Sequence, residues 1–279
     1  MILSQHSMPN VSVIIPTHNR PELLKRAIAS VQAQTYRDFE LIVIEDRESK
    51  GGGWARNQGI KKTHGKFIAF LDDDDEWLPE KLEVQMRAFE QTPEDVGFCF
   101  SAVINVYEDR EQRTQVLDGL DWYADRAIDI KYFSDFLTVT LVVKRAVFDM
   151  VGVFDEALPS HQELDFIIRT SKRYRGLGLN VPLVRVNMKN NTPRIGTNLD
   201  RRIAGRLRVI EKNFTEIQKH PGILAAHYFA LGLLYRDNRY YQEAHDAFKL
   251  AFKSKFSFRY LLHYGSMMMR GFFYDVFIR

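Results

Sequence analysis

The sequence of 279 residues predicts an α/β protein, in which helices cover both faces of a mostly parallel β-sheet, followed by an α-helical C-terminal region. Two observations lead to this fold class. Over roughly the first 200 residues, short β-branched runs alternate with segments whose apolar residues have helical spacing. After about Asn198 the strand signals end, and helix-forming and aromatic residues dominate. Near-continuous apolar strands that alternate with helices are typical of parallel sheets with right-handed crossovers.

The chain begins with a strand, helix, strand, helix, strand pattern. The predicted strands are Val11–Pro16, Phe39–Ile44 and Lys66–Leu71, and the helices between them are Pro21–Thr35 and Ala55–Lys62. Further strands are expected at Val96–Ile104 and Thr138–Lys144, and further helices near Pro79, at Arg145–Val151 and at Glu163–Tyr174. Polar clusters directly follow the first three strands. Because ligands bind at the carboxyl ends of strands in open α/β sheets, we expect one crevice there.

We expect two domains, 1–198 and 199–279, because composition and charge change together near Asn198. From Arg201 onward there are about 14 lysine and arginine residues and about 6 aspartate and glutamate residues, so the preceding part is acidic. Within the basic region, Ala225–Phe256 has small and apolar residues at the offsets of a tetratricopeptide hairpin, with Phe256 in place of the closing proline. One such hairpin cannot bury its own face, so it is expected to pack against neighbouring helices, the first domain or another chain.

The composition excludes several classes of protein. With 45% hydrophobic and 27% charged residues, the chain is neither disordered nor an integral membrane protein. The formal net charge of +3 is too small for a nucleic-acid-binding protein. The N-terminus lacks the basic and apolar segments of a secretion signal, and the single cysteine, Cys99, cannot form an internal disulfide. The expected location is the cytoplasm.

Asp72–Asp75 form an acidic run directly after a predicted strand. Neighbouring carboxylates raise one another's pKa unless a cation compensates their charge. Carboxylate oxygens without nearby His or Cys favour Mg²⁺ or Mn²⁺ over Zn²⁺. The run therefore predicts a divalent metal site. The alternative is that Asp74 or Asp75 caps the following helix and the other carboxylates are solvated.

Two longer stretches contain motifs in a characteristic order. They read PTHNRPELLKRAIASVQAQTYRDFELIVIEDRES and GGGWARNQGIKKTHGKFIAFLDDDDEWLPEKL. In this order they resemble the nucleotide-binding half of family 2 glycosyltransferases of the GT-A fold, and the resemblance extends from Val11 to about Arg169. It implies a Rossmann-like sheet with a nucleotide-sugar half at about 9–104 and an acceptor half at about 105–198. The Gly-x-Gly-x-x-Gly motif of dinucleotide-binding enzymes is absent.

The resemblance implies a nucleotide-sugar site at the ends of the first two strands. Pro16, His18 and Arg20 lie in the first motif, and His18 has the position that packs against the nucleotide base, although a loop histidine is often only solvated. Glu45 and Asp46 have the positions of the carboxylates that bind base and ribose. The family usually has Asp-Asp-Gly here, so the base preference stays open. The alternative for Asp46 is an Asx turn.

The resemblance also places the diphosphate and the metal. Gly51–Gly53 allow the backbone to approach a ligand or simply form a flexible turn, and Arg56 offers a planar set of donors to a diphosphate. Asp72, Asp73 and Asp74 stand at the family's Asp-x-Asp motif. By that match Asp74 and Asp72 bind Mn²⁺ or Mg²⁺, and Asp72 and Asp73 hold ribose or metal-bound water. Such a metal offsets the charge on the departing nucleoside diphosphate.

The segment FDEALPSHQELDFIIR resembles the part of the family that supplies the catalytic base. Gln162 and Glu163 stand where the family has Glu-Asp. The resemblance therefore implies Glu163 as the base that accepts the acceptor's hydroxyl proton, with Asp165 as the second choice. The alternative is that both carboxylates only stabilise the first turn of a helix.

The resemblance implies a metal-dependent, inverting glycosyltransferase that moves a sugar from a nucleoside-diphosphate sugar, a UDP-sugar first of all, to an acceptor hydroxyl. Its expected partners are the sugar donor and a glycan or lipid-linked acceptor, in surface polysaccharide or glycolipid synthesis. One alternative is a sugar nucleotidyltransferase. Another is a nucleotide-binding scaffold with decayed catalysis that acts through its C-terminal helices.

The C-terminal tail, Phe256–Arg279, mixes aromatic residues and methionines with lysine and arginine. This composition suits a helix lying on an anionic membrane, which would make the protein peripheral at the inner membrane face. An equally open alternative is a helix whose aromatic residues are buried in the core or in a homo-oligomer contact.

Overall fold

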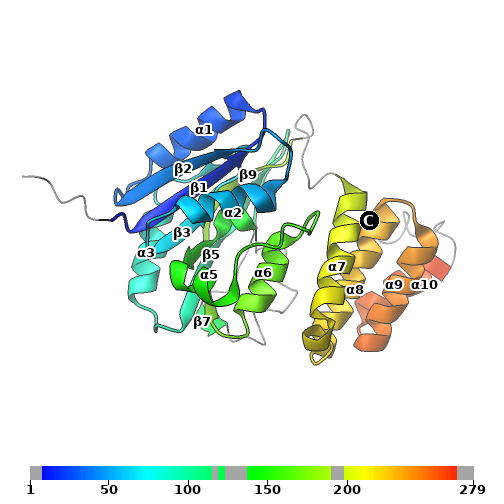
Figure 1. Cartoon of the computed structure of the whole chain (residues 1–279). Helices are drawn as coiled ribbons and strands as arrows, with labels where there is room; N and C mark the ends of the chain where they lie inside the picture. The colour runs from blue at the N-terminus through cyan, green and yellow to red at the C-terminus, as the bar shows by residue number, and fades with distance from the viewer. Residues whose placement is uncertain (1–7, 115–118, 123–136, 190–197, 269–279) are drawn as a thin grey trace, which may run out of the picture. The chain divides into compact units, whose positions relative to one another are not determined.

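The computed structural model describes residues 8–114, 119–122, 137–189 and 198–268, and within these ranges the chain forms two compact units (Figure 1). Unit 1 comprises the described residues of Met1–Ala127, Tyr132–Glu156 and Phe166–Thr192. Unit 2 comprises Ala157–Asp165 and the described residues of Pro193–Arg279. The prediction assigns 157–165 to the first domain, whereas in the structure this segment is grouped with the C-terminal helices. Parts of the predicted acceptor half and of the aromatic tail lie outside the described residues.

Unit 1 is built on one mixed sheet with the strand order β2-β1-β3-β8-β5-β9-β4. These strands are β1 (Val11–Thr17), β2 (Phe39–Glu45), β3 (Phe67–Phe70), β4 (Glu76–Trp77), β5 (Val96–Val106), β8 (Val142–Lys144) and β9 (Arg175–Asn187). Two short strands, β6 (Glu111–Arg113) and β7 (Gly119–Trp122), pair with β5 and β9. Strand β1 is parallel to β2 and β3, and β5 to β9, while β8 and β4 are antiparallel to their neighbours. The predicted α/β fold class is confirmed, with a more mixed sheet than expected.

Helices cover both faces of the sheet because β1 sends alternate side chains into two cores. The helices are α1 (Pro21–Gln32), α2 (Gly52–Lys62), α3 (Lys81–Glu90), α5 (Arg145–Val151) and α6 (Gln162–Thr170). Val13 and Ile15 pack with residues of α1 and α3, whereas Ile14 packs with residues of α2 and α5. Figure 1 shows α1 and α2 on opposite sides of the strands. A Cβ on Gly59 would lie 2.5 Å from Cγ2 of Ile14, so glycine lets α2 approach β1 closely.

The segment before β8 differs from the prediction. One strand is predicted over Thr138–Lys144, but Thr138–Thr140 form a short 3₁₀ helix and only Val142–Lys144 pair with the sheet. The indole Nε1 of Trp77 donates a hydrogen bond to the carbonyl of Val139 at 3.0 Å, so a side chain satisfies this carbonyl instead of a neighbouring strand.

Strand β9 is a second difference between the structure and the prediction, because no strand is predicted there. Its sequence, RGLGLNVPLVRVN, contains two glycines and a proline, which weaken the signal of a central strand. Its pairing with β5 also has register shifts around Ala102. β9 carries Arg185 and Asn187 to the edge where the candidate site lies.

Unit 2 consists mainly of four helices, α7 (Leu199–Ile217), α8 (Pro221–Asp237), α9 (Tyr241–Ser254) and α10 (Phe258–Met268). Helices α8 and α9 form a hairpin around Phe229, Ala244 and Phe248. A Cβ on Gly232 would lie 2.6 Å from the Phe248 ring, so this glycine lets the two helices pack closely. The resemblance of the hairpin to a tetratricopeptide repeat stays a prediction. In the described part of the chain, no helix has both the length and the apolar character needed to span a bilayer.

Candidate active site

The loop after β1 is tied to the acidic run after β3. Thr17 Oγ1 donates to Oδ2 of Asp73 at 2.7 Å, and Arg20 Nη1 donates to Oδ1 of the same carboxylate at 3.1 Å. Arg20 also lies 3.7 Å from Oδ2 of Asp74. Both strands are parallel, so their carboxyl ends meet at one edge and these loops come together as predicted. Pro16 lies within β1 opposite Ile44 and is buried.

The loop after β2 is closed by Asp46. Its carboxylate accepts hydrogen bonds from the backbone N–H groups of Lys50 at 2.9 Å and Gly51 at 2.6 Å. Gly51 has φ of 101°, a conformation that favours glycine. The carbonyl of Asp46 lies 2.6 Å from Nδ1 of His18, so the first and second loops are connected. Asp46 therefore stabilises the loop through its carboxylate, as in the alternative of an Asx turn. Contact between Asp46 and the nucleotide base remains a prediction. Glu45 is half exposed and pairs with Arg47 at 2.8 Å.

Arg56 projects from α2 toward the acidic run. Its Nη2 lies 2.5 Å from Oδ1 of Asp72, and the Arg56 side chain is 11% exposed, compared with 34% for Asp72. A Cβ on Gly52 would lie 2.9 Å from Nη1 of Arg56, so this glycine leaves the guanidinium its space. Arg56 is therefore held at the edge where the resemblance places the diphosphate.

The four aspartates have different environments. Burial raises the pKa of Asp73; the hydrogen bond from Thr17 and the charge of Arg20 oppose the rise, and the neighbouring aspartates add to it. Asp75 is 4% exposed and accepts a hydrogen bond from the backbone N–H of Asn187 at 2.8 Å. This contact gives Asp75 a structural role that connects the run to β9.

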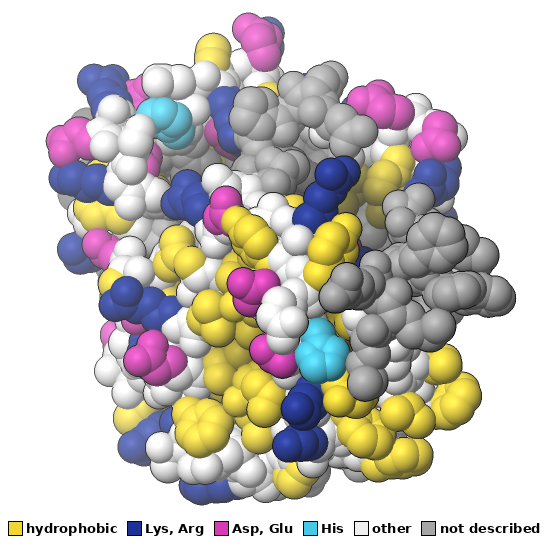
Figure 2. Space-filling view, turned by 90° about the vertical axis from the view of Figure 1, so that its right-hand side faces the viewer, with side chains coloured by type: hydrophobic (Ala, Val, Ile, Leu, Met, Phe, Trp, Pro, Cys, Tyr) yellow, Lys and Arg dark blue, Asp and Glu magenta, His cyan; other side chains and the backbone are white. Residues whose placement is uncertain are grey.

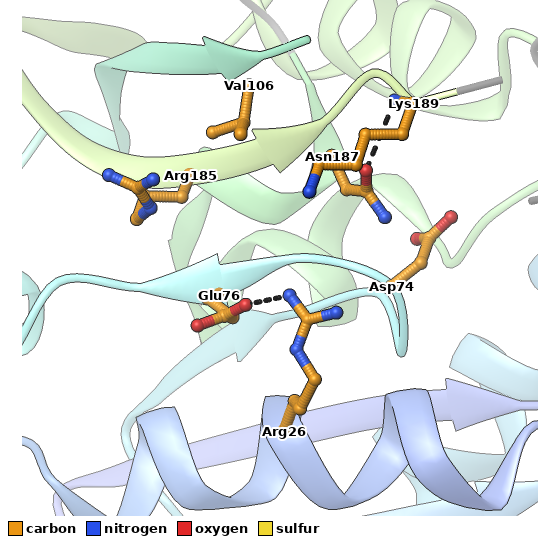
Figure 3. Close-up of a pocket in the computed structure, with 7 residues that line it drawn as sticks. All are labelled: Arg26, Asp74, Glu76, Val106, Arg185, Asn187 and Lys189. Atoms are coloured by element: carbon orange, nitrogen blue, oxygen red, sulfur yellow. Dashed lines mark hydrogen bonds and ion pairs between the residues drawn. The ribbon is translucent and has the colours of Figure 1, made fainter. Parts of the chain in front are cut away.

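Asp74 lines a small pocket with charged walls (Figure 3). The other lining residues are Arg26, Glu76, Val106, Arg185, Asn187 and Lys189. Arg26 forms an ion pair with Glu76, and Arg185 forms one with Glu111. Apart from Asp74, none of the lining residues is predicted from the sequence. They come from α1, β4, β5, β9 and the segment after β9, and no motif connects them in the sequence.

The residues present fit a metal that arrives with a phosphate-bearing ligand. In the described ranges, no group of three His, Cys, Asp or Glu side chains is arranged to hold a metal by itself. Asp72 is paired with Arg56, and Asp73 with Thr17 and Arg20. Asp74 also lies near Arg20 and lines the pocket. Mg²⁺ is usually held in this way, by one or two carboxylates together with substrate phosphates.

The two candidate bases belong to unit 2. Asp165 is fully buried, and its carboxylate pairs with Lys212 Nζ at 3.0 Å and accepts a hydrogen bond from Asn213 Nδ2 at 3.2 Å. Glu163 lies in the first turn of the same helix, and its charge raises the pKa of the buried Arg206 of α7. Asp165 thus has a packing role that joins α6 to α7, and Glu163 remains the better candidate for a proton acceptor.

The matches to known proteins agree with this geometry. The family model described as "Glycosyl transferase family 2" matches residues 12–50 and 43–153. Together these ranges span half of the chain, and they contain nearly all of β1, β2 to β8, and the residues Asp46, Arg56 and Asp72–Asp74. The chain therefore belongs to glycosyltransferase family 2.

Several relatives share part of the sequence. An uncharacterized glycosyltransferase of Rickettsia prowazekii is 27% identical over 184 residues, which cover 56% of this chain and 57% of that protein. A glucosyltransferase of Escherichia coli, described as acting from UDP-Glc on α-D-GlcNAc-diphosphoundecaprenol, is 36% identical over 99 residues, or 27% of this chain and 39% of its own length. The chain thus matches little more than half of the first relative, and less of the second.

Solved structures share the fold. Staphylococcus aureus TarS, residues 1–349 in complex with UDP-GlcNAc, has a TM-score of 0.56 and 13% identity, and the match covers 94% of this chain and 92% of that one. A mannosyltransferase of Pyrobaculum calidifontis, in complex with GDP-Man and Mn²⁺, has a TM-score of 0.57 and 16% identity, with 97% and 83% covered. At these identities the likeness concerns the fold, and it confirms the GT-A class.

Proposed function

We propose that this protein transfers a sugar from a nucleoside-diphosphate sugar to an acceptor hydroxyl with the help of a divalent metal. One observation carries the proposal. Arg20, in the loop after β1, and Arg56, on α2, pair with Asp73 and Asp72 of the acidic run, and Asp74 lines the adjacent pocket. Cations and carboxylates placed together at the carboxyl edge of a sheet suit a diphosphate and its metal.

The reaction is a single in-line displacement that inverts the anomeric carbon. The acceptor oxygen bonds to that carbon while the bond from the carbon to the diphosphate oxygen breaks, and the acceptor proton passes to the carboxylate of Glu163. Arg20 and Arg56 offset the negative charge on the departing diphosphate. Mn²⁺ or Mg²⁺ held by Asp74 and Asp72 would supply further positive charge at the same place.

A UDP-sugar is the first choice of donor. TarS is solved with UDP-GlcNAc, and the E. coli relative is described as using UDP-Glc, whereas the P. calidifontis enzyme is solved with GDP-Man. His18 and Asp46, joined at 2.6 Å, form the loop pair that would lie next to the base, with Glu45 beside them. Pro16 fixes the end of β1 from which this loop starts.

The proposed acceptor is a glycan or a lipid-linked sugar in surface polysaccharide or glycolipid synthesis. The E. coli relative is described as acting on a lipid-linked diphosphate sugar. On unit 2, the end of α9 and the start of α10 expose apolar side chains next to cationic ones: Leu250, Lys253, Lys255, Phe256, Phe258, Arg259, Leu261 and Leu262. Figure 2 shows hydrophobic and cationic side chains mixed along the lower edge of one face. Such a mixture suits the surface of an anionic membrane, where these acceptors reside.

A thermal-shift panel of UDP, GDP, CDP and dTDP, each with Mn²⁺, Mg²⁺ or EDTA, tests the donor site. A ligand that binds only the folded state raises its stability, so UDP is expected to raise the Tm when metal is present and much less in EDTA. UDP-sugars are then tested for transfer to a lipid-linked acceptor. If no nucleotide raises the Tm, the proposal is wrong. Pyrophosphate release would indicate a nucleotidyltransferase, and nucleotide binding without turnover would indicate a scaffold.

Sedimentation with vesicles tests the membrane surface. The protein is expected to bind anionic vesicles at low salt and to release them at high salt, because exposed cations are screened. The paired change Phe256→Ser and Phe258→Ser, at side chains that are 73% and 68% exposed, should weaken this binding. Equal binding to neutral vesicles, or none to either kind, would contradict a peripheral membrane role.

A further inference from the structure

The segment 157–165, which carries the candidate base, is fastened to helix α7. Ser160 Oγ donates a hydrogen bond to the carbonyl of Arg201 at 2.9 Å. At the next turn of α7, a Cβ on Gly205 would lie 2.2 Å from Ser160 Oγ and 2.7 Å from the Ser160 carbonyl. Only glycine at position 205 lets the helix approach the segment this closely.

A second attachment lies at the other end of the segment. The carboxylate of Asp165 is fully buried and is held by Lys212 and Asn213 of α7 at 3.0 Å and 3.2 Å. Asn213 Nδ2 also donates to the carbonyl of Val209 at 3.0 Å, which fixes the amide on the helix. Glu163 therefore lies between two points at which α7 holds the chain.

Arg206 of α7 is a buried cation whose charge is felt by, and feels, that of Glu163. It is 7% exposed and lies between the two attachments, one residue after Gly205. Burial lowers the pKa of Arg206 to about 10, the nearby Arg202 lowers it too, and the charge of Glu163 opposes both. Attraction between two charges is mutual, so the guanidinium also favours the ionised form of Glu163.

We propose that Arg206 is a positioning residue for Glu163, which lies in the same compact unit. This inference rests on the proposed function only in the role given to Glu163. In this proposal the nearby positive charge of Arg206 favours the ionised carboxylate of Glu163, which is then ready to accept a proton from an acceptor hydroxyl. Arg206 itself touches no reacting atom in this proposal.

Other charged and titratable groups surround this pair. Arg202 lies one turn before Arg206 on α7, and His161 precedes the segment's helix. Burial lowers the pKa of His161 to about 3, and the charges of Arg206 and Arg202 act in the same direction. Burial also lowers the pKa of His227, on α8, well below its ordinary value. Both histidines are neutral at pH 7, so a pH change between 6 and 9 leaves the charges of these neighbours unchanged.

The test combines steady-state kinetics with a titration that needs no turnover. Arg206→Met, Arg206→Gln and Arg206→Lys are compared with Arg208→Met, which removes an exposed arginine of the same helix. Arg206→Met is expected to lower kcat by roughly 10-fold or more with the donor KM within about 2-fold. The acidic limb of its kcat profile should move to higher pH, and Arg206→Lys should restore much of the rate. Arg208→Met should behave as the wild type.

Carbon-13 NMR of glutamate-labelled protein, with the Glu163 signal assigned from Glu163→Gln, follows the carboxylate directly. Its titration midpoint should rise in Arg206→Met, and in Arg206→Gln if the methionine variant does not fold. An unchanged midpoint overturns the inference whether or not the protein transfers sugar. If the wild type transfers no sugar but the Glu163 midpoint still shifts in the Arg206 variant, the proposed function is overturned instead. A fully active Glu163→Gln overturns the role of the base and the inference with it.

Discussion

Arg56 of α2 and Asp72 of the acidic run are joined at 2.5 Å, so the residue matched to the diphosphate and a residue matched to the metal form one ion pair. Under the proposed function, a diphosphate that enters this site would compete with Asp72 for the Arg56 guanidinium. If Arg56 paired with the phosphates instead, the Asp72 carboxylate would be available to a cation. Donor binding and metal binding would then be coupled through this ion pair.

Replacing Arg56 should weaken donor binding. Arg56→Met removes a charge-assisted contact, for which a loss of about 1.5–3 kcal/mol is typical, or roughly 10-fold to 150-fold in Kd. Isothermal titration with UDP and Mn²⁺ measures this loss. Arg47→Met is the matched control, since the Arg47 side chain is 82% exposed and pairs only locally with Glu45. Equal effects of the two changes would contradict the role given to Arg56.

Asp74 and Asp75 should differ in what their loss affects. Asp74→Asn is expected to abolish the metal-dependent part of the Tm increase by UDP while the ligand-free Tm stays close to the wild type. Asp75→Asn removes the strong acceptor for the Asn187 N–H, at 2.8 Å in a buried place, and should lower the unfolding free energy by about 1–3 kcal/mol. Metal-dependent binding that survives in Asp74→Asn would show that the metal is held elsewhere.

Lys81 should make stability depend on pH. It is fully buried, its Nζ donates to Gln85 Oε1 at 2.6 Å and lies 4.1 Å from the Trp77 ring centre, and burial lowers its pKa to about 7. The unfolded chain keeps the ordinary pKa of 10.5 and binds the extra proton between these values. This residue's contribution to the unfolding free energy therefore rises from about pH 7 to about pH 10 and is constant below that range.

Urea unfolding at several pH values compares the wild type with Lys81→Met. The stability of Lys81→Met relative to the wild type should be greatest near pH 6 and should decrease as the pH rises. Lys25→Met, at an exposed position on α1, should show no such trend. A parallel pH dependence in all three proteins would mean that Lys81 does not titrate in this range.

Gly205 and Gly265 offer a matched pair of glycine substitutions in unit 2. Gly205→Ala places a Cβ 2.7 Å from the backbone carbonyl of Ser160, which cannot move away cheaply, so a loss of about 1–3 kcal/mol in unfolding free energy is expected. Gly265→Ala, within α10, meets no atom within 4 Å and should raise stability by up to about 1 kcal/mol through helix propensity. Thermal denaturation that shows the opposite order would refute the close contact between α7 and Ser160.

The sequence predicts well what depends on local pattern. The helix expected at Arg145–Val151 forms with those bounds, and β1 to β3 appear within a residue or two of their predicted ends. Strong apolar runs specify these strands without tertiary contacts. A proline in the first turn likewise marks the start of α1. Strand β9 was not predicted, since pairing with β5 outweighs its glycines and proline.

Part of the candidate site is also predictable from local sequence patterns, and part of it is not. The motifs predict that Arg20, Arg56 and Asp73 come together, because parallel strands bring the segments that follow them to one edge of the sheet. The pocket residues Arg26 and Arg185 follow no motif spacing, so only the folded sheet brings them beside Asp74. The burial of Asp165 could not be predicted either, because its partners Lys212 and Asn213 lie far along the chain.

The fastening of 157–165 to α7 has a practical consequence for chimeric proteins. Exchanging the C-terminal helices at 198 alone would leave Asp165 without Lys212 and Asn213, and Ser160 without the Arg201 carbonyl. A buried carboxylate that loses its partners is strongly destabilising. A graft of these helices onto another family member therefore needs to include the stretch from Ala157 to Asp165. The two segments are separate in the sequence but have to be exchanged as one unit.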